Sequence, residues 1–140
     1  MFEAGGPMDE AAISLAVYGE TLKPNEVSSL LGVEATSSFE AGHKRGPRSP
    51  PIPHGAWFYQ VRGSHPLTPE DLTTMLLAQL PTDPAVWSAL GSPFRTQIRV
   101  ALHMDAWNRG FAFSSATLKR IADTGAELNF DIYAYADPDA

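Results

Sequence analysis

The sequence predicts an α+β domain with a mainly antiparallel five-stranded sheet and helices packed on one of its faces. Residues 12–19, 97–104 and 128–135 alternate apolar and polar side chains, as half-buried strands do. Capped helical segments lie between them, and 140 residues with 44% hydrophobic and 19% charged composition are typical of one globular domain. We expect residues 1–10 to be a disordered leader and residues 11–137 to form a single α+β domain.

The last third of the chain shows the strand alternation most clearly, around a tight turn at 107–110 and a helix. Its apolar positions are Ile98, Val100, Leu102 and Met104 in one strand, and Leu128, Phe130, Ile132 and Ala134 in the other. The polar phase holds Gln97, Arg99, Ala101 and His103, and then Asn129, Asp131, Tyr133 and Tyr135. Such alternation predicts antiparallel strands with one buried face and one open face.

Four helices are expected from their start and stop signals. They are Pro24–Leu31 followed by Gly32, a helix from Thr68 that stops before Pro81, Asp83–Gly91, and Ser115–Gly125. Their apolar stripes are Leu72, Met75, Leu76 and Leu80, then Val86, Trp87 and Leu90, and finally Leu118, Ile121 and Ala122. Two helix-then-glycine segments, at 27–34 and 118–127, suggest a pair of related ferredoxin-like halves.

Residues 34–55 form a long segment rich in proline, glycine and serine, without helical or strand periodicity. Loops of this length in a compact domain are usually functional or mobile. Its Gly42-His43-Lys44-Arg45-Gly46 stretch is either an anion-binding loop or a solvated basic loop, and it lacks the spacing of a P-loop. The following strand, 56–62, has aromatic residues in both phases, which leaves open the face that Trp57 occupies.

The net charge of −6 argues against binding to nucleic acid or to an anionic membrane. The chain has no cysteine, which excludes disulfides and thiolate ligands, and its four histidines lack the spacing of a metal site. We therefore expect no cofactor and no metal. No apolar run is long enough to span a bilayer, and a bacterial cytoplasmic protein is the simplest interpretation.

The open sheet face is the best candidate for a functional surface. The candidate binding residues are Tyr18, Arg99, His103, Trp107, Asn108, Asp131 and Tyr133. Five of them lie on the polar phase of predicted strands, whereas Trp107 and Asn108 lie in the 107–110 turn, which is first of all structural. No nucleophile elbow or other catalytic set is present, so no catalytic residue is assigned. The same face could instead be covered by the proline-rich loop or by a second subunit.

Several motifs give the chain a resemblance to an uncharacterised bacterial family, the domain of unknown function 4279 family. They are Tyr18-Gly19, Leu22-x-Pro24-x-Glu26-Val27-x-x-Leu30-Leu31-Gly32, Thr36-x-x-Phe39-x-x-Gly42, Trp57, Trp107-Asn108-x-Gly110-Phe111 and Asp131-Ile132-Tyr133. The family has no established activity, so the resemblance implies no reaction and no site residue. Some members are similar to small immunity-type proteins found near toxin genes.

These observations favour a small non-enzymatic binding or interaction protein over an enzyme. Its acidic charge would suit a protein partner with a basic surface, as in immunity proteins. The alternative is a small-molecule-binding protein or weak enzyme built around Arg99, His103 and Asp131. In a third interpretation the protein is a homodimer whose open faces pair, so both a monomer and a homodimer are retained.

Overall fold

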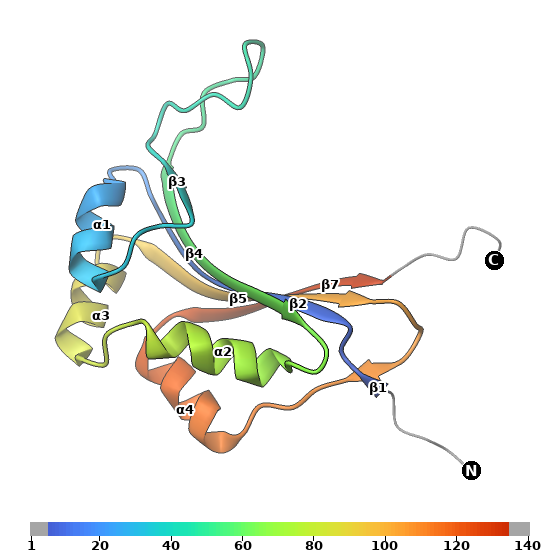
Figure 1. The fold of residues 1–140 in the computed structure, drawn as a ribbon. Helices are drawn as coiled ribbons and strands as arrows, with labels where there is room; N and C mark the ends of the chain where they lie inside the picture. Colours follow the sequence, from blue (N-terminus) through green and yellow to red (C-terminus); the bar gives the residue numbers. More distant parts are fainter. Residues whose placement is uncertain (1–5, 135–140) are drawn as a thin grey trace.

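The computed structural model describes residues 6–134, which form an α+β fold of two layers (Figure 1). The strands are β1 (Gly6–Pro7), β2 (Glu10–Gly19), β3 (Ser37–Phe39), β4 (Gly55–Ser64), β5 (Arg95–Met104), β6 (Arg109–Gly110) and β7 (Glu127–Ala134). The helices are α1 (Pro24–Leu31), α2 (Pro69–Ala78), α3 (Pro84–Gly91) and α4 (Ser115–Asp123). The predicted fold class is confirmed.

The main sheet has five strands in the order β3-β4-β2-β5-β7. Its central strand β2 pairs antiparallel with β4 and β5, and β3 pairs antiparallel with β4. The prediction of an antiparallel last strand is wrong, because β7 runs parallel to β5. The α4 helix supplies the crossover that two parallel neighbours require. The short strands β1 and β6 form a separate parallel pair.

The connectivity contains one ferredoxin-like unit rather than two. The order β2-α1-β3-β4-helices-β5 is a βαββαβ arrangement, and its four strands lie as β3-β4-β2-β5 in the sheet. The α4–β7 segment then adds a fifth strand at the β5 edge. The similarity between the two helix-then-glycine segments therefore reflects two helix ends, each with a glycine at positive φ, and not a repeated domain.

The four helices of residues 6–134 lie on one face of the curved sheet, and none of them covers the opposite face (Figure 1). Alternation along the strands explains this arrangement, because Ile13 and Leu15 of β2 and Ile98 and Val100 of β5 are fully buried under the helices. Trp57 of β4 belongs to the same buried set, which resolves its face. Its indole Nε1 donates a hydrogen bond to the Ser28 hydroxyl in α1, 2.9 Å away.

The apolar phase of β7 is only partly buried, contrary to expectation. Leu128 packs against the core, but Phe130 and Ile132 keep 45% and 58% of their surface exposed. Phe130 and Ile132 are exposed because β7 is an edge strand that extends beyond the ends of the helices (Figure 1). Met75 of α2 and Leu118 of α4 were also expected in the core and are exposed.

The ordered domain begins earlier than the predicted boundary after residue 10. Within the expected leader, Gly6–Pro7 is strand β1 and Met8 is buried in the core. Strand β3 lies inside the segment predicted to lack regular structure, and its three residues are too few to give a periodic signal. Residues 1–5, Tyr135 and the predicted domain end at 137 lie outside the described residues.

Candidate functional site

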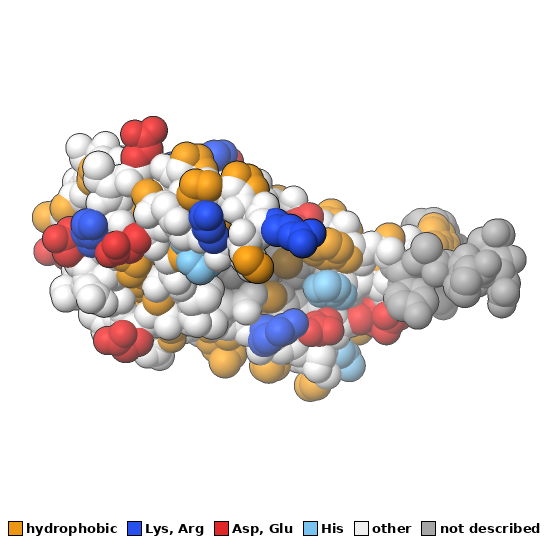
Figure 2. Space-filling model, turned by 90° about the horizontal axis from the view of Figure 1, so that it is seen from above, with side chains coloured by type: hydrophobic (Ala, Val, Ile, Leu, Met, Phe, Trp, Pro, Cys, Tyr) orange, Lys and Arg blue, Asp and Glu red, His pale blue; other side chains and the backbone are white. Residues whose placement is uncertain are grey.

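The open face, the sheet surface opposite the helices, is the candidate site. It consists of Ala12, Ser14, Ala16 and Tyr18 of β2, Phe58, Gln60 and Arg62 of β4, Arg95, Gln97, Arg99, Ala101 and His103 of β5, and Glu127, Asn129, Asp131 and Tyr133 of β7. Figure 2 looks down on this side of the molecule, where basic, acidic and histidine side chains lie close to one another.

A chain of contacts crosses from β5 to β7 on the open face. The Arg99 guanidinium lies 3.6 Å from the Asp131 carboxylate. Asp131 also accepts a hydrogen bond from the Tyr133 hydroxyl, with an O···O distance of 2.6 Å. The Tyr133 ring stacks on the His103 imidazole, with 4.9 Å between the ring centroids. Four of the residues predicted from strand periodicity are therefore neighbours.

The hydrogen bond to Asp131 raises the pKa of the Tyr133 hydroxyl, because the carboxylate stabilises the protonated phenol. The negative charge of Asp131 acts in the same direction, and the Arg99 guanidinium opposes it weakly. Tyr133 is therefore held as a neutral hydrogen-bond donor. It is not prepared to act as a base at neutral pH.

A second set of contacts lies four residues further along the same two strands. Arg95 donates to both carboxylate oxygens of Glu127, at 3.3 and 3.4 Å. The Gln97 side-chain amide, which is buried, donates to the same carboxylate at 3.3 Å. A third ion pair joins Arg62 to Glu10. The charged groups of these four strands therefore form three pairs of opposite charge.

Two adjacent hollows open on this face and share Arg99. The larger, about 550 Å³, is lined by Tyr18, Gly19, Glu20, His54, Arg95, Gln97, Arg99 and Asn129. The smaller, about 260 Å³, is lined by Ser14, Thr36, Ser37, Phe58, Gln60 and Arg99. Small side chains on central strand β2, Ala12, Ser14 and Ala16, explain the depression, because the longer side chains of β4 and β5 rise on either side of them.

Aromatic rings border the hollows at the β3 end of the sheet. The Tyr18 ring makes edge contacts with Phe58 and His54, with centroid distances of 5.7 and 5.9 Å. Phe39 stacks on His43 from the proline-rich connection. This connection extends beyond the upper end of β3 and β4, so only its base borders the open face (Figure 1).

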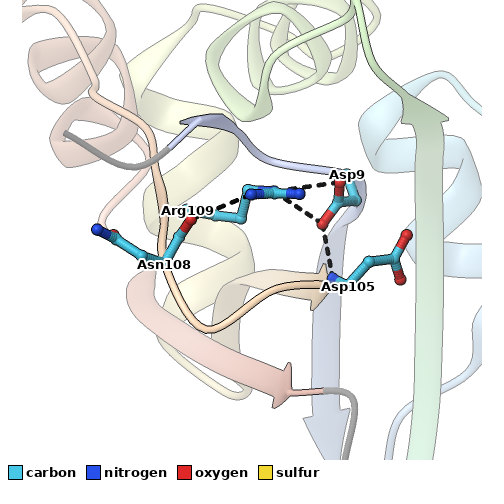
Figure 3. Close-up of polar contacts among 4 residues, drawn as sticks. All are labelled: Asp9, Asp105, Asn108 and Arg109. Carbon is cyan, nitrogen blue, oxygen red and sulfur yellow. Dashed lines mark hydrogen bonds and ion pairs between the residues drawn. The ribbon is translucent and has the colours of Figure 1, made fainter. Parts of the chain in front are cut away.

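The structure separates Trp107 and Asn108 from the other predicted residues. Neither borders the two hollows, and the Trp107 side chain is 88% exposed. The turn is instead fastened to the start of β2, as Figure 3 shows. Arg109 Nε donates to both Asp9 oxygens, and Asp9 Oδ2 accepts from the Asp105 backbone N–H at 2.7 Å. That backbone hydrogen bond is the main reason that the pKa of Asp9 lies below its ordinary value.

Some residues of the site were missed by sequence reasoning. The alternation already placed Gln97 on the polar phase, although it was not among the candidate binding residues. Arg95 has the same strand phase as Arg99, so periodicity could have placed it on the open face as well. Asn129 was likewise on the predicted polar phase without being chosen as a binding residue, and Glu127 has the same phase and could have been found in this way. His54 lies within the irregular segment 34–55, and no sequence signal indicated its position.

Two observations bear on acid–base and metal chemistry. No ion pair joins His103 to a carboxylate in the part of the chain that is described, and its ring faces Tyr133 instead. Among residues 6–134, no three His, Asp or Glu side chains gather as a metal-ligand set. None of the helices in that range is long and apolar enough to cross a membrane.

The fold and site thus define a small α+β domain with a polar sheet face that no other part of residues 6–134 covers. The chain belongs to the DUF4279 family, a domain of unknown function, whose sequence model matches residues 9–135. This match confirms the resemblance seen in the sequence motifs. Neither a curated protein nor a solved structure matches the chain.

Proposed function

We propose that this domain is a non-enzymatic binding module that recognises a protein partner through its open face. The observation that carries the proposal is the pair of adjacent hollows over β2. They meet at Arg99 and are bordered by polar and aromatic side chains. Arginine and aromatic residues are enriched at the centres of protein interfaces. A shallow hollow lined by polar groups suits a partner's side chain better than a drug-like ligand, which favours enclosed apolar pockets.

The ion pairs on the open face support recognition of charged groups. Exposed pairs contribute little to stability, so Arg95 and Arg99 can exchange their carboxylates for those of a partner at low cost. Since positive and negative groups are balanced on these strands, the acidic excess of the chain lies elsewhere. The basic partner expected from net charge stays a prediction, as does the bacterial cytoplasm as the place of action.

Selection from a random peptide display library tests the proposal. Peptides selected on the wild-type protein should bind the Arg99→Ala variant at least tenfold more weakly, because Arg99 borders both hollows. Lys119→Ala is the matched control, since Lys119 also forms an exposed ion pair, with Asp123 of α4. Selected peptides that bind all three proteins equally would overturn the proposal.

A small acidic ligand is the second candidate, favoured by the two arginines in the larger hollow. Titration with citrate or inorganic phosphate, followed by backbone amide NMR, would then shift the signals of Arg95, Gln97 and Arg99. Unchanged spectra at millimolar concentrations would remove this candidate and leave the protein-binding proposal intact.

A further inference from the structure

An apolar patch lies at the β7 edge of the sheet, uncovered within the described residues. We define this β7 edge patch as Phe111, Phe130 and Ile132, which are 37%, 45% and 58% exposed. The rings of Phe111 and Phe130 contact each other, with 6.1 Å between their centroids, and Phe113 adds a third ring beneath them. Apolar groups that gather in this way on a surface usually mark an interaction site.

The backbone of the same strand is also available. Among the described strands, β7 pairs only with β5, so one edge of its eight residues is free. The opposite edge of the sheet is β3, which has only three residues. Free edges that stay unpaired usually carry charged side chains, above all lysine, or proline or a bulge. The two charged residues of β7, Glu127 and Asp131, form ion pairs with Arg95 and Arg99 of β5. The sequence of β7, Glu127–Ala134, contains neither lysine nor proline.

We propose that β7 pairs with β7 of a second copy of the chain, antiparallel and across a two-fold axis. Such an interface uses one surface twice, so the strand must be complementary to itself. When the two-fold axis passes beside Phe130, Phe130 lies opposite Phe130 of the second copy. Leu128 then lies opposite Ile132 of the second copy. All the apolar residues then lie together on the helix side of the joined sheet.

The polar side of β7 is complementary in the same register. Asn129 comes opposite Asp131 of the second copy, and Glu127 comes opposite Tyr133, so no like charges face each other. Moving the axis by one residue, to Asp131, would set that carboxylate against itself. An axis at Asn129 would set Glu127 against Asp131 of the second copy. The charges of β7 therefore disfavour both registers next to the pairing centred on Phe130.

The pairing would join two sheets into one of ten strands and place the two open faces side by side. It differs from a dimer in which the open faces cover each other, and it does not depend on the proposed function. An interface of a single strand and a small patch is smaller than a standard one, so we expect a dissociation constant in the micromolar range.

Sedimentation equilibrium of the full chain between about 1 and 200 µM tests the proposal. The wild type should change from monomer to dimer across this range, and Ile132→Lys should weaken the dimer at least tenfold. Met75→Lys is the matched control, because Met75 is 47% exposed and lies on α2, away from the sheet edge. A monomeric wild type, or an equal effect of both variants, would overturn the proposal.

Hydrogen exchange on the wild type provides a measurement that needs no variant to fold. Amides of β7 should exchange more slowly as the concentration rises, whereas those of β3 should not change. Protection that appears on Arg99 and its neighbours in the central strands instead would indicate that the open faces pair, and would contradict pairing at β7.

Discussion

The Arg99 guanidinium lies 3.6 Å from the Asp131 carboxylate, and the two residues come from neighbouring strands of the open face. Asp131 also accepts a hydrogen bond from the Tyr133 hydroxyl, so one carboxylate contacts two neighbouring side chains. Arg99 lies at the boundary of the two hollows, with donors left for a bound partner. The parallel pairing of β5 with β7 therefore brings an ion pair to the edge of the proposed binding surface.

Replacing Asp131 should change the titration of Tyr133. In Asp131→Asn the pKa of Tyr133 should fall toward its ordinary value of 10.0, because the carboxylate that stabilises the protonated phenol is gone. Tyrosinate absorbance against pH measures this, with Tyr133→Phe identifying the contribution of Tyr133. Identical curves for wild type and Asp131→Asn would show that the hydrogen bond is not formed in solution.

The same group has a consequence for stability at high pH. Because the folded-state pKa of Tyr133 is raised, its contribution to stability is fully present below the ordinary value. That contribution is lost as the pH rises through the folded-state pKa. The wild type should therefore have a higher thermal unfolding midpoint than Tyr133→Phe, and this difference should decrease only in strongly alkaline solution.

The contacts of Asp9 should stabilise the junction between β2 and the 107–110 turn. Asp9→Ala should lower the thermal midpoint by a few degrees, since it leaves Arg109 and the Asp105 N–H without their acceptor. Asp105→Ala is the control, because it keeps that backbone N–H. The folded-state pKa of Asp9 is lowered, so the effect should be complete above the ordinary pKa of 3.8 and disappear as the pH falls through the folded-state value. Equal midpoints for the two variants near neutral pH would contradict this role.

The start of α2 depends on a reciprocal cap. The Thr68 hydroxyl accepts from the Asp71 N–H at 3.0 Å, and the Asp71 carboxylate accepts from the Thr68 N–H at 2.9 Å. Thr68→Ala should cost about 1 kcal/mol in the free energy of unfolding measured with urea. Thr74→Ala, at an exposed position within the same helix, should have no comparable cost. A similar loss for both variants would mean that the cap is not what stabilises this end.

Gly55 is needed at the start of β4 for a steric reason. A Cβ atom there would lie 3.0 Å from the Leu22 carbonyl oxygen and 3.1 Å from that of Phe39. Gly55→Ala should therefore reduce stability by about 1–3 kcal/mol. Gly91→Ala, where the space is open, should instead raise stability slightly by restricting the unfolded chain. Denaturant unfolding of both variants measures the difference. A Gly55→Ala variant as stable as the wild type would contradict the steric requirement for glycine at this position.

Local sequence signals predicted most of the architecture. The cap at Thr68, the proline at the start of α1 and the glycine after it placed these helices correctly. Alternation in β5 predicted both its buried side and the exposed side of Arg99 and His103. Each of these signals depends on neighbouring residues alone, which is why it could be read without the fold.

Other features depend on long-range pairing and could not be predicted in this way. The direction of β7 follows from its neighbour β5, and the exposure of Phe130 follows from its position beyond the helices. The attachment of Arg109 to Asp9 joins residues about a hundred positions apart. The positions of Trp107 and Asn108 outside the hollows likewise depend on how the chain folds around the 107–110 turn.

Backbone amide NMR of the wild-type protein with its tightest library-selected peptide tests the central claim, binding at the open face, most directly. We predict that the largest shift changes fall on Ser14, Gln97, Arg99 and Asn129, which border the hollows. Changes centred on Leu77, Thr117 and Arg120, which line a hollow between α2 and α4 on the opposite side of the sheet, would contradict it.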